Sequence, residues 1–485
     1  MKSKISVGVK ASVVYTIAIL FSKGLSFITV PIFTRLMPTD QIGIVNLYNS
    51  WFAMISSIAT LSLTSGGFQV ALKEFEDRRD EYVSSVLSLT MFLALLFGGI
   101  YFFSPKSIEK MIGLDRDFII MILGGLLVTP ATEFWLSRNR YEYKYIKAAI
   151  LTMSSAFFAS LVSVIFVILA SENGIRELAK VRLVANNFVI YFVAFLLCIS
   201  IFLKGKTLYN KKFWKFSLSL SIPLVGNSFA VQLLNLADRS MISKLNGNSA
   251  VGIYSTLSTV SAISSIVWGA INSSFVPFLF SNYENKDKRE DIKKVANLIL
   301  LLYAIVAIGL TVIAPEIVKI LATKEYYDAI FIMPPIAAGI FMMSVSALYS
   351  NILIMLKKTQ YIMVSSLAAA TVNVILNYLC IKQWGYMAAA YTTLVAYVVM
   401  AGMQFVVSKY ICTKNCMVDE EIYNNKIIWL IAVLTICMCL LCIFLYNNLF
   451  VRYFVIVVIC LVVFIFRKQI MTIIKKDGKE RNDKI

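Results

Sequence analysis

The sequence predicts an all-α membrane protein with about fourteen transmembrane helices. Apolar residues make up 59% of the 485 residues, and charged residues only 15%. The mean hydropathy of +0.78 is far above that of a soluble domain, which must cover its surface with charge. The apolar residues gather in runs of about 20, which is the length needed to cross a hydrocarbon core of about 30 Å.

Each apolar run is bounded by charged or polar residues, which mark the expected helix ends. The expected spans are residues 11–33, 44–64, 83–103, 118–135, 146–170, 181–203, 216–237, 250–280, 295–321, 330–356, 361–381, 386–407, 427–446 and 449–466. No connecting segment is longer than about 19 residues, which is too short for a folded domain outside the membrane.

Lysine and arginine are distributed unevenly over alternate connecting segments. If the N-terminus is cytoplasmic, 32 of the 46 basic residues fall on the cytoplasmic side and 13 on the external side, and the last one is Lys23. Short cytoplasmic loops retain positive charge, so we expect both termini in the cytoplasm. The net charge of +19 then points to the anionic cytoplasmic leaflet as the partner and not to nucleic acid.

A faint internal repeat divides the chain. Thr34-Arg35 precede Gly43 at the passage from the first to the second span, and Asp238-Arg239 precede Gly252 at the passage from the seventh to the eighth. Six helices separate the two segments, which predicts two six-helix lobes in the same orientation with a substrate site between them. The expected divisions are 1–205 for the N-terminal lobe, 206–410 for the C-terminal lobe, 411–467 for a last helix pair and 468–485 for a basic cytoplasmic tail.

Lys23 is the sharpest signal in the sequence. The apolar stretches on either side of it are each too short to span the bilayer, so the lysine must lie near the middle of the membrane. A lysine at the centre of a spanning helix costs about 2.5–3.5 kcal/mol on insertion scales. We therefore expect Lys23 to face a hydrated cavity on a substrate path, with a structural ion pair as the alternative.

The fourth span carries a second candidate. Glu133 lies three residues after Pro130, and a proline in a membrane helix frees a carbonyl that other groups or water must satisfy. Glu133 could face the same cavity and take up a coupling proton or sodium ion, or it could be an interfacial carboxylate beside Arg138 and Arg140. Arg138 is included among the expected cavity residues.

Further polar residues occur at helix ends and within the eleventh span. Arg35, Asp238 and Arg239 are expected at the external ends of the first and seventh spans, either as contacts for an anionic head group or as interface anchors. Asp238 is the second candidate for ion coupling. Asn373 and Asn377, four residues apart, share one helix face and form either a polar lining or an interhelical hydrogen bond.

Several kinds of chemistry are disfavoured by the sequence. The chain has no histidine, so proton coupling would need carboxylates, and no metal site or cofactor is expected beyond a coupling H⁺ or Na⁺. Gly205-Lys206-Thr207 resembles the end of a phosphate-binding loop, but residue 200 is serine and no strand precedes it. We expect a protein that is not an enzyme.

The order of three segments resembles the bacterial polysaccharide-transporter flippases of the multidrug/oligosaccharidyl-lipid/polysaccharide exporter superfamily, which export O-antigen and capsule repeat units. The segments are Pro31-Ile32-Phe33-Thr34-Arg35-Leu36 with Gly43 beyond, Ala237-Asp238-Arg239-Ser240-Met241-Ile242 with Gly252-Ile253-Tyr254 beyond, and Asn373-Val374-Ile375-Leu376-Asn377 with Gly385 and Ala388-Ala389-Ala390 beyond.

This resemblance implies a V-shaped bundle that works by alternating access in the bacterial inner membrane. Its cationic cavity would accept the diphosphate and sugars of an undecaprenyl-linked unit, with ion-driven antiport and a groove formed by the last two helices. A polymerase and a chain-length regulator of the same pathway are the implied protein partners. From the residues alone, a charged head group needs polar partners to cross hydrocarbon.

Other functions remain open at this point. A cation-coupled multidrug exporter of the same superfamily would favour a more acidic cavity. A membrane polysaccharide polymerase or glycosyltransferase is disfavoured by the short external loops, and a scaffold for envelope synthesis that transports nothing is a further alternative.

Overall fold

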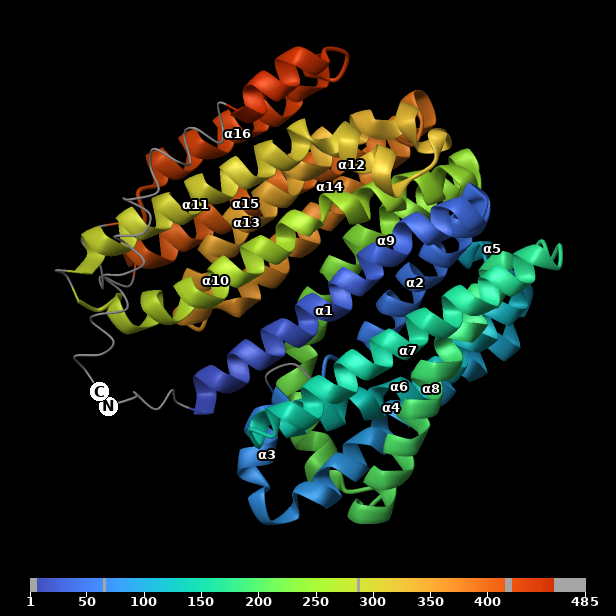
Figure 1. Ribbon diagram of the computed structural model, residues 1–485. Helices are drawn as coiled ribbons and strands as arrows, with labels where there is room; N and C mark the ends of the chain where they lie inside the picture. Colours follow the sequence, from blue (N-terminus) through green and yellow to red (C-terminus); the bar gives the residue numbers. More distant parts are fainter. Residues whose placement is uncertain (1–6, 64–66, 286–287, 415–420, 458–485) are drawn as a thin grey trace, which may run out of the picture.

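The computed structural model describes residues 7–63, 67–285, 288–414 and 421–457, and every regular element in these ranges is a helix (Figure 1). The elements are α1 (Val7–Leu36), α2 (Thr39–Ala59), α3 (Gly67–Glu74), η1 (Glu76–Arg78), α4 (Arg79–Phe103), α5 (Pro105–Ile112), α6 (Arg116–Tyr141), α7 (Tyr145–Glu172), α8 (Leu178–Gly205), α9 (Lys211–Ser261), α10 (Ile263–Asn282), α11 (Arg289–Val312), α12 (Ala314–Leu321), η3 (Lys324–Ile332), α13 (Met333–Met355), α14 (Thr359–Trp384), α15 (Ala388–Lys414) and α16 (Asn425–Leu445). The prediction of an all-α membrane protein is confirmed for this part of the chain.

Twelve helical stretches in the described ranges are long and apolar enough to cross a membrane. One of them, Val225–Asn282, has 58 residues, which at a rise of 1.5 Å per residue is far more than a bilayer needs. Gly247 interrupts it with φ 84° and ψ 170°, a backbone conformation that L side chains rarely adopt. Helices α9 and α10 together therefore hold the predicted seventh and eighth spans, with the interruption at Gly247 between them.

The helix ends differ from the expected span ends at one place, and a second expected span is described only in part. Asp238 and Arg239 do not end a helix, because α9 continues past them to the turn at Gly247. The fourteenth predicted span, residues 449–466, is helical over 449–457, and its remainder and the expected basic tail lie outside the described residues.

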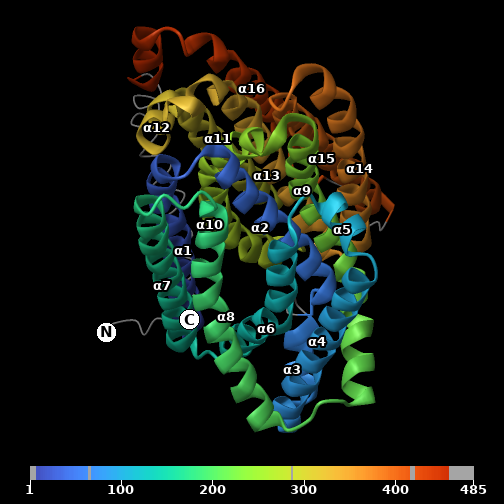
Figure 2. The same cartoon turned by 90° about the vertical axis from the view of Figure 1, so that its right-hand side faces the viewer.

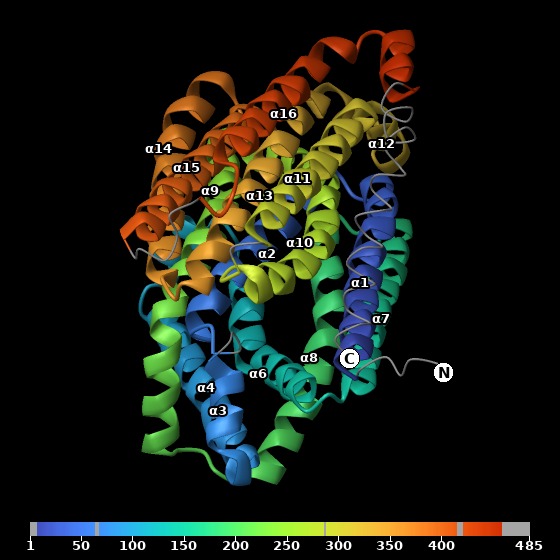
Figure 3. The ribbon, with the colours of Figure 1, turned by 90° about the vertical axis from the view of Figure 1, so that its left-hand side faces the viewer.

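The helices gather into two bundles. One contains α1, α2, α4, α6, α7 and α8, and the other contains α10, α11, α12, α13, α14, α15 and α16 (Figure 1). Views from either side show α4, α6 and α8 at the bottom and α11, α13, α15 and α16 at the top (Figures 2 and 3). The bundles approach each other where α1 passes into α2, and they diverge toward the opposite end (Figure 1).

Helix α9 passes from one bundle to the other. At its start, Phe213 is buried against aromatic residues of the first bundle, and Ser217 hydrogen-bonds to Tyr82 of α4 at 2.8 Å. Further along, Asn227 accepts a hydrogen bond from Ser366 of α14 at 3.1 Å. The chain therefore crosses between the bundles inside a continuous helix, which couples their positions.

Two glycines allow the bundles to meet at the end where they approach. A Cβ added to Gly43 would lie 1.8 Å from the carbonyl oxygen of Asn248, and a Cβ added to Gly252 would lie 2.0 Å from that of Thr39. Each glycine thus lies against a backbone carbonyl of the other segment. The hydroxyls of Thr39 and Ser249 add a hydrogen bond of 2.6 Å between the segments. The two segments of the sequence repeat thus pack directly against each other with no room for a side chain.

Candidate functional site

A buried carboxylate lies within the second bundle. Asp238 of α9 is only 5% exposed, and both of its oxygens accept hydrogen bonds. Oδ1 accepts from the side-chain amides of Asn377 at 2.7 Å and Asn373 at 3.2 Å. Oδ2 accepts from the hydroxyls of Tyr254 and Thr393, each at 2.7 Å. Four donors thus offset part of the cost of burying this charge.

Three features of the local sequence bring these groups together. Asn373 and Asn377 are one helical turn apart on α14, so both point to the same side and both are fully buried. The turn at Gly247 sends the chain back so that Tyr254 returns to Asp238. Gly385, with φ +72°, ends α14 and lets α15 bring Thr393 alongside.

The cluster is rich in oxygen but carries a single carboxylate. Besides Asp238, it contains the hydroxyls of Tyr254 and Thr393 and the amide oxygens of Asn373 and Asn377. Rotating the two amides would turn their oxygens toward the carboxylate, since the two ends of an amide differ little in shape. One positive charge, a proton or a monovalent cation, would balance such a site.

Arg239 and Arg35, the arginines of the two repeat segments, both donate hydrogen bonds to backbone carbonyls. Arg239 donates from Nη1 to the carbonyl of Asn235 at 2.9 Å and from Nε to the hydroxyl of Ser255 at 3.0 Å. Arg35 uses Nη1 in the same way on Pro31, at 2.7 Å. The arginines of the two repeat segments therefore make the same contact one turn back along their helices.

Arg35 also joins the two bundles. Its Nη2 donates to the carbonyl of Ile320 at 2.9 Å, and the hydroxyl of Thr34 donates to that of Leu321 at 2.8 Å. Both acceptors are in the last turn of α12, where helix carbonyls lack partners within the helix. At this position Arg35 ties α1 to the second bundle.

Lys23 is exposed on α1, and no ion pair joins it to a carboxylate in the described part of the chain. Helical spacing places Lys23 near the hydroxyl residues Thr16 and Ser26, and the exposed apolar side chains of Ile19 and Leu20 lie one turn before the lysine on the same side. The surface around Lys23 thus mixes hydroxyl and apolar side chains at mid-span.

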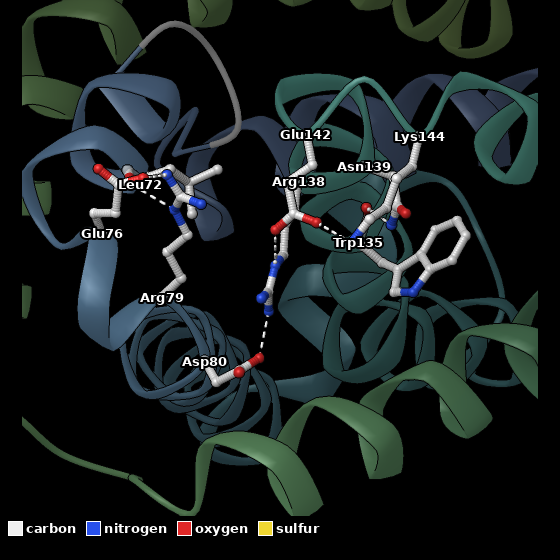
Figure 4. Close-up of polar contacts among 9 residues, drawn as sticks. All are labelled: Leu72, Glu76, Arg79, Asp80, Trp135, Arg138, Asn139, Glu142 and Lys144. Carbon is white, nitrogen blue, oxygen red and sulfur yellow. Dashed lines mark hydrogen bonds and ion pairs between the residues drawn. The ribbon is translucent and has the colours of Figure 1, made fainter.

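Glu133 and Arg138 are on the last turns of α6 but have different surroundings. Glu133 is exposed. Arg138 lies between two acids, with Nη1 2.5 Å from Asp80 of α4 and Nε 2.8 Å from Glu142 (Figure 4). Burial works against ionisation of Glu142, but hydrogen bonds from Arg138 and Lys144 hold its pKa below the usual range.

The structure therefore brings only some of the predicted residues together. Asp238, Asn373 and Asn377 form one cluster, whereas Arg35 and Arg138 belong to other places in the fold. Tyr254 and Thr393 were missed by the sequence reasoning. Thr393 carries a usable signal, because it and Thr392 are adjacent hydroxyl residues in an apolar span, whereas nothing local marks Tyr254 as a partner of Asp238.

Residues 9–283 match the model of a family described as polysaccharide biosynthesis protein, and residues 223–379 match the MatE family. A relative from Haloferax volcanii, the probable low-salt glycan biosynthesis flippase Agl15, is 23% identical over 396 residues, which is 80% of this chain and 81% of that protein.

Solved structures with a similar fold include the lipid II flippase MurJ in an inward closed conformation. It matches with a TM-score of 0.67 and 15% identity over 94% of this chain and all of that chain. An inward-facing multidrug resistance transporter of the MATE family matches with a TM-score of 0.61 and 14% identity over 84% of this chain and all of that chain. At these identities the likeness concerns the fold.

Proposed function

Because the chain belongs to the polysaccharide biosynthesis protein family, we propose that it moves a lipid-linked oligosaccharide across the membrane. It is a multi-pass membrane transporter and not an enzyme. The observation that carries the proposal is the cation Lys23, exposed in the middle of a helix that is long and apolar enough to span the membrane. A cation there lowers the cost of bringing a charged head group into the membrane.

We further propose that the substrate is an undecaprenyl-diphosphate-linked repeat unit for O-antigen or capsule. Its diphosphate and sugars would pass between the two bundles while the polyprenyl chain stays in lipid. The excess of lysine and arginine on one side supports a bacterial inner-membrane location with both termini cytoplasmic. A polymerase and a chain-length regulator would act on the exported unit.

The contacts at the closed end suggest which step of the cycle the structure represents. Arg35, Thr34 and the Gly43–Gly252 crossing hold the bundles together at the end that the charge distribution assigns to the exterior. The bundles diverge toward the cytoplasmic end (Figure 1). We propose that this is the inward-facing state and that release outside requires these contacts to break.

We propose Asp238 as the group that couples transport to an ion, either H⁺ or Na⁺. Tyr254 on the far side of the Gly247 turn, and Asn373 and Thr393 on two other helices, all bond to this carboxylate. A proton or cation that neutralises Asp238 would change the bonding of three helices at once. Such a change favours one arrangement of the second bundle over another.

The decisive experiment uses purified protein in liposomes with a fluorescent undecaprenyl-diphosphate oligosaccharide. We expect protein-dependent movement of the unmodified lipid to the opposite leaflet, accelerated by a Na⁺ or H⁺ gradient. A product with altered covalent structure, or no movement with several glycans, would contradict the proposal.

The MatE match over residues 223–379 favours one second candidate, a cation-coupled multidrug exporter. The same liposomes loaded with ethidium test it. Ion-driven efflux of the dye without movement of the lipid-linked glycan would support the exporter over the flippase.

A further inference from the structure

The first bundle contains a polar cavity that Lys23 does not line. It has a volume of about 410 Å³ and lies at one end of the bundle between α4, α6, α7 and α8. Its size is in the range of small-molecule sites in proteins. Charged side chains line it, namely Asp80, Arg138, Glu142, Lys144, Lys147 and Lys204.

The charges in this cavity do not balance. Four lining residues are cations and two are carboxylates, so the cavity has a net charge of +2. Both carboxylates are already engaged by Arg138, and the second oxygen of Glu142 is 2.5 Å from Nζ of Lys144 (Figure 4). The uncompensated positive charge therefore resides on the two remaining lysines.

Those two lysines are Lys147 at the start of α7 and Lys204 near the end of α8. Both are exposed, and neither has a carboxylate within 4 Å in the described ranges of the chain. They line the same cavity from different helices. Two lysines at one hollow, with every nearby acid already bonded elsewhere, are suited to a bound anion.

The rim of the cavity is held by backbone geometry. Tyr143 adopts a positive φ of 55°, which is uncommon for a residue other than glycine. This turn lets the backbone N–H of Lys144 donate to the carbonyl of Asn139 at 2.8 Å, and the Asn139 amide donates to the carbonyl of Trp135, also at 2.8 Å. The segment that carries Glu142 and Lys144 is thus fixed over the cavity.

The position of the cavity identifies the source of the anion. It lies at the ends of helices that the distribution of lysine and arginine places in the cytoplasm, and Trp135, a residue type favoured at membrane interfaces, lines it. Basic pockets between membrane helices on this side bind anionic lipid head groups. We propose that this cavity binds the phosphate of an anionic phospholipid of the cytoplasmic leaflet, bridged by Lys147 and Lys204.

This inference rests on the cytoplasmic orientation given under the proposed function, but it requires no transport. A lipid phosphate between Lys147 and Lys204 would tie the start of α7 to the end of α8, next to the ion pairs that join α6 to α4. The bound lipid would stabilise the first bundle as one unit while the second bundle moves.

The test compares lipid binding by the full chain and two double variants, using native mass spectrometry of detergent-purified protein. The first variant is Lys147→Gln with Lys204→Gln. The control is Lys211→Gln with Lys215→Gln, which removes two exposed lysines from the same side of the molecule outside the cavity. The probes are phosphatidylglycerol, phosphatidylcholine and inorganic phosphate.

We expect the wild type and the control to bind phosphatidylglycerol in preference to phosphatidylcholine, and the cavity variant to bind it at least about tenfold more weakly. Competition by millimolar inorganic phosphate would show that the phosphate group is what is recognised. Equal loss of binding in both double variants, or unchanged binding in the cavity variant, would overturn the proposal. Binding of phosphate with no preference for phosphatidylglycerol would overturn the lipid as the source. Flipping activity is not measured, so failure here leaves the transport proposal untouched.

Discussion

Lys23 shows how much one residue can determine in a membrane protein. It is exposed at mid-span on α1, where Ser26 and the apolar side chains of Ile19 and Leu20 lie on the same side of the helix. A cation in that position is tolerated where water or an anionic ligand reaches it. In the transport cycle that we propose, this anionic ligand is the head group of the substrate.

Replacing Lys23 with Ala should abolish glycan flipping in liposomes, because the head group loses its cation at the middle of the membrane. Lys23→Arg keeps the charge and should retain measurable flipping. Protein abundance in the membrane, measured by quantitative blotting, should be unchanged in both. Normal export by Lys23→Ala would remove Lys23 from the transport path.

Asp238→Asn should remove the ion dependence of transport, because the neutral amide has almost the same shape but no charge to balance. For the wild type, Na⁺ at 100 times its Kd would raise the free energy of unfolding by about 2.7 kcal/mol if Na⁺ is the coupling ion. Thermal unfolding in Na⁺ and in K⁺ measures this effect.

The matched control is Asp117→Asn, which removes an exposed carboxylate that pairs with Lys180 on the surface. It should leave the ion response intact. A Na⁺ stabilisation that survives in Asp238→Asn would place the sodium site elsewhere, and flipping that follows only a pH gradient would assign H⁺ as the ion.

The partners of Asp238 can be tested separately. Tyr254→Phe removes a buried hydroxyl that donates at 2.7 Å to the carboxylate, and hydrogen bonds to charged groups contribute about 1.5–3 kcal/mol. We expect a loss of stability of that size in denaturant unfolding. An unchanged stability would mean that Asp238 is neutral or solvated in the native protein.

At the scale of elements, the crossing of α2 with the helix after Gly247 determines how closely the bundles approach. Because a Cβ on Gly43 would overlap the carbonyl of Asn248, Gly43→Ala must push the two helices apart. We expect a lower melting temperature and slower flipping, because the closed outer end is destabilised.

Gly98→Ala in α4 is the control for this substitution. No heavy atom lies within 4 Å of the added Cβ, and Ala is favoured over Gly inside a helix by about 0.5–1 kcal/mol. This variant should match or exceed the wild type in both measurements. Equal melting temperatures and flipping rates in the two alanine variants would show that the helices at Gly43 are not closely packed.

At the scale of the whole molecule, alternating access requires the two bundles to separate where they now meet. The hydroxyls of Thr39 and Ser249 are 2.6 Å apart across that meeting point. We expect Thr39→Cys with Ser249→Cys to form a disulfide under oxidation, to stop flipping and to recover it with dithiothreitol.

Each single cysteine variant, treated with the same oxidant, controls for the native cysteines and for damage. If the oxidised double variant forms the disulfide and still flips substrate at the normal rate, this end of the molecule does not open during transport.

Hydropathy and charge along the chain are enough to establish the membrane class, the place of most spans and the unusual position of Lys23. These follow from the free energy of moving each side chain out of water, which depends on local composition and length. The sequence also pairs Asn373 with Asn377, because four residues make one helical turn. Its assignment of Asp238 and Arg239 to a helix end was wrong, since the hydropathy drop there precedes the true turn at Gly247.

Which polar groups meet depends instead on how the helices pack. Tyr254, Thr393 and the two asparagines converge on Asp238 from separate segments, and Arg35 finds its acceptors on α12, far along the chain. Arg138 is likewise held by Asp80 across two helices and does not lie beside the Asp238 cluster. Contacts of this kind depend on how helices pack in three dimensions, which hydropathy and helical periodicity along one chain do not specify.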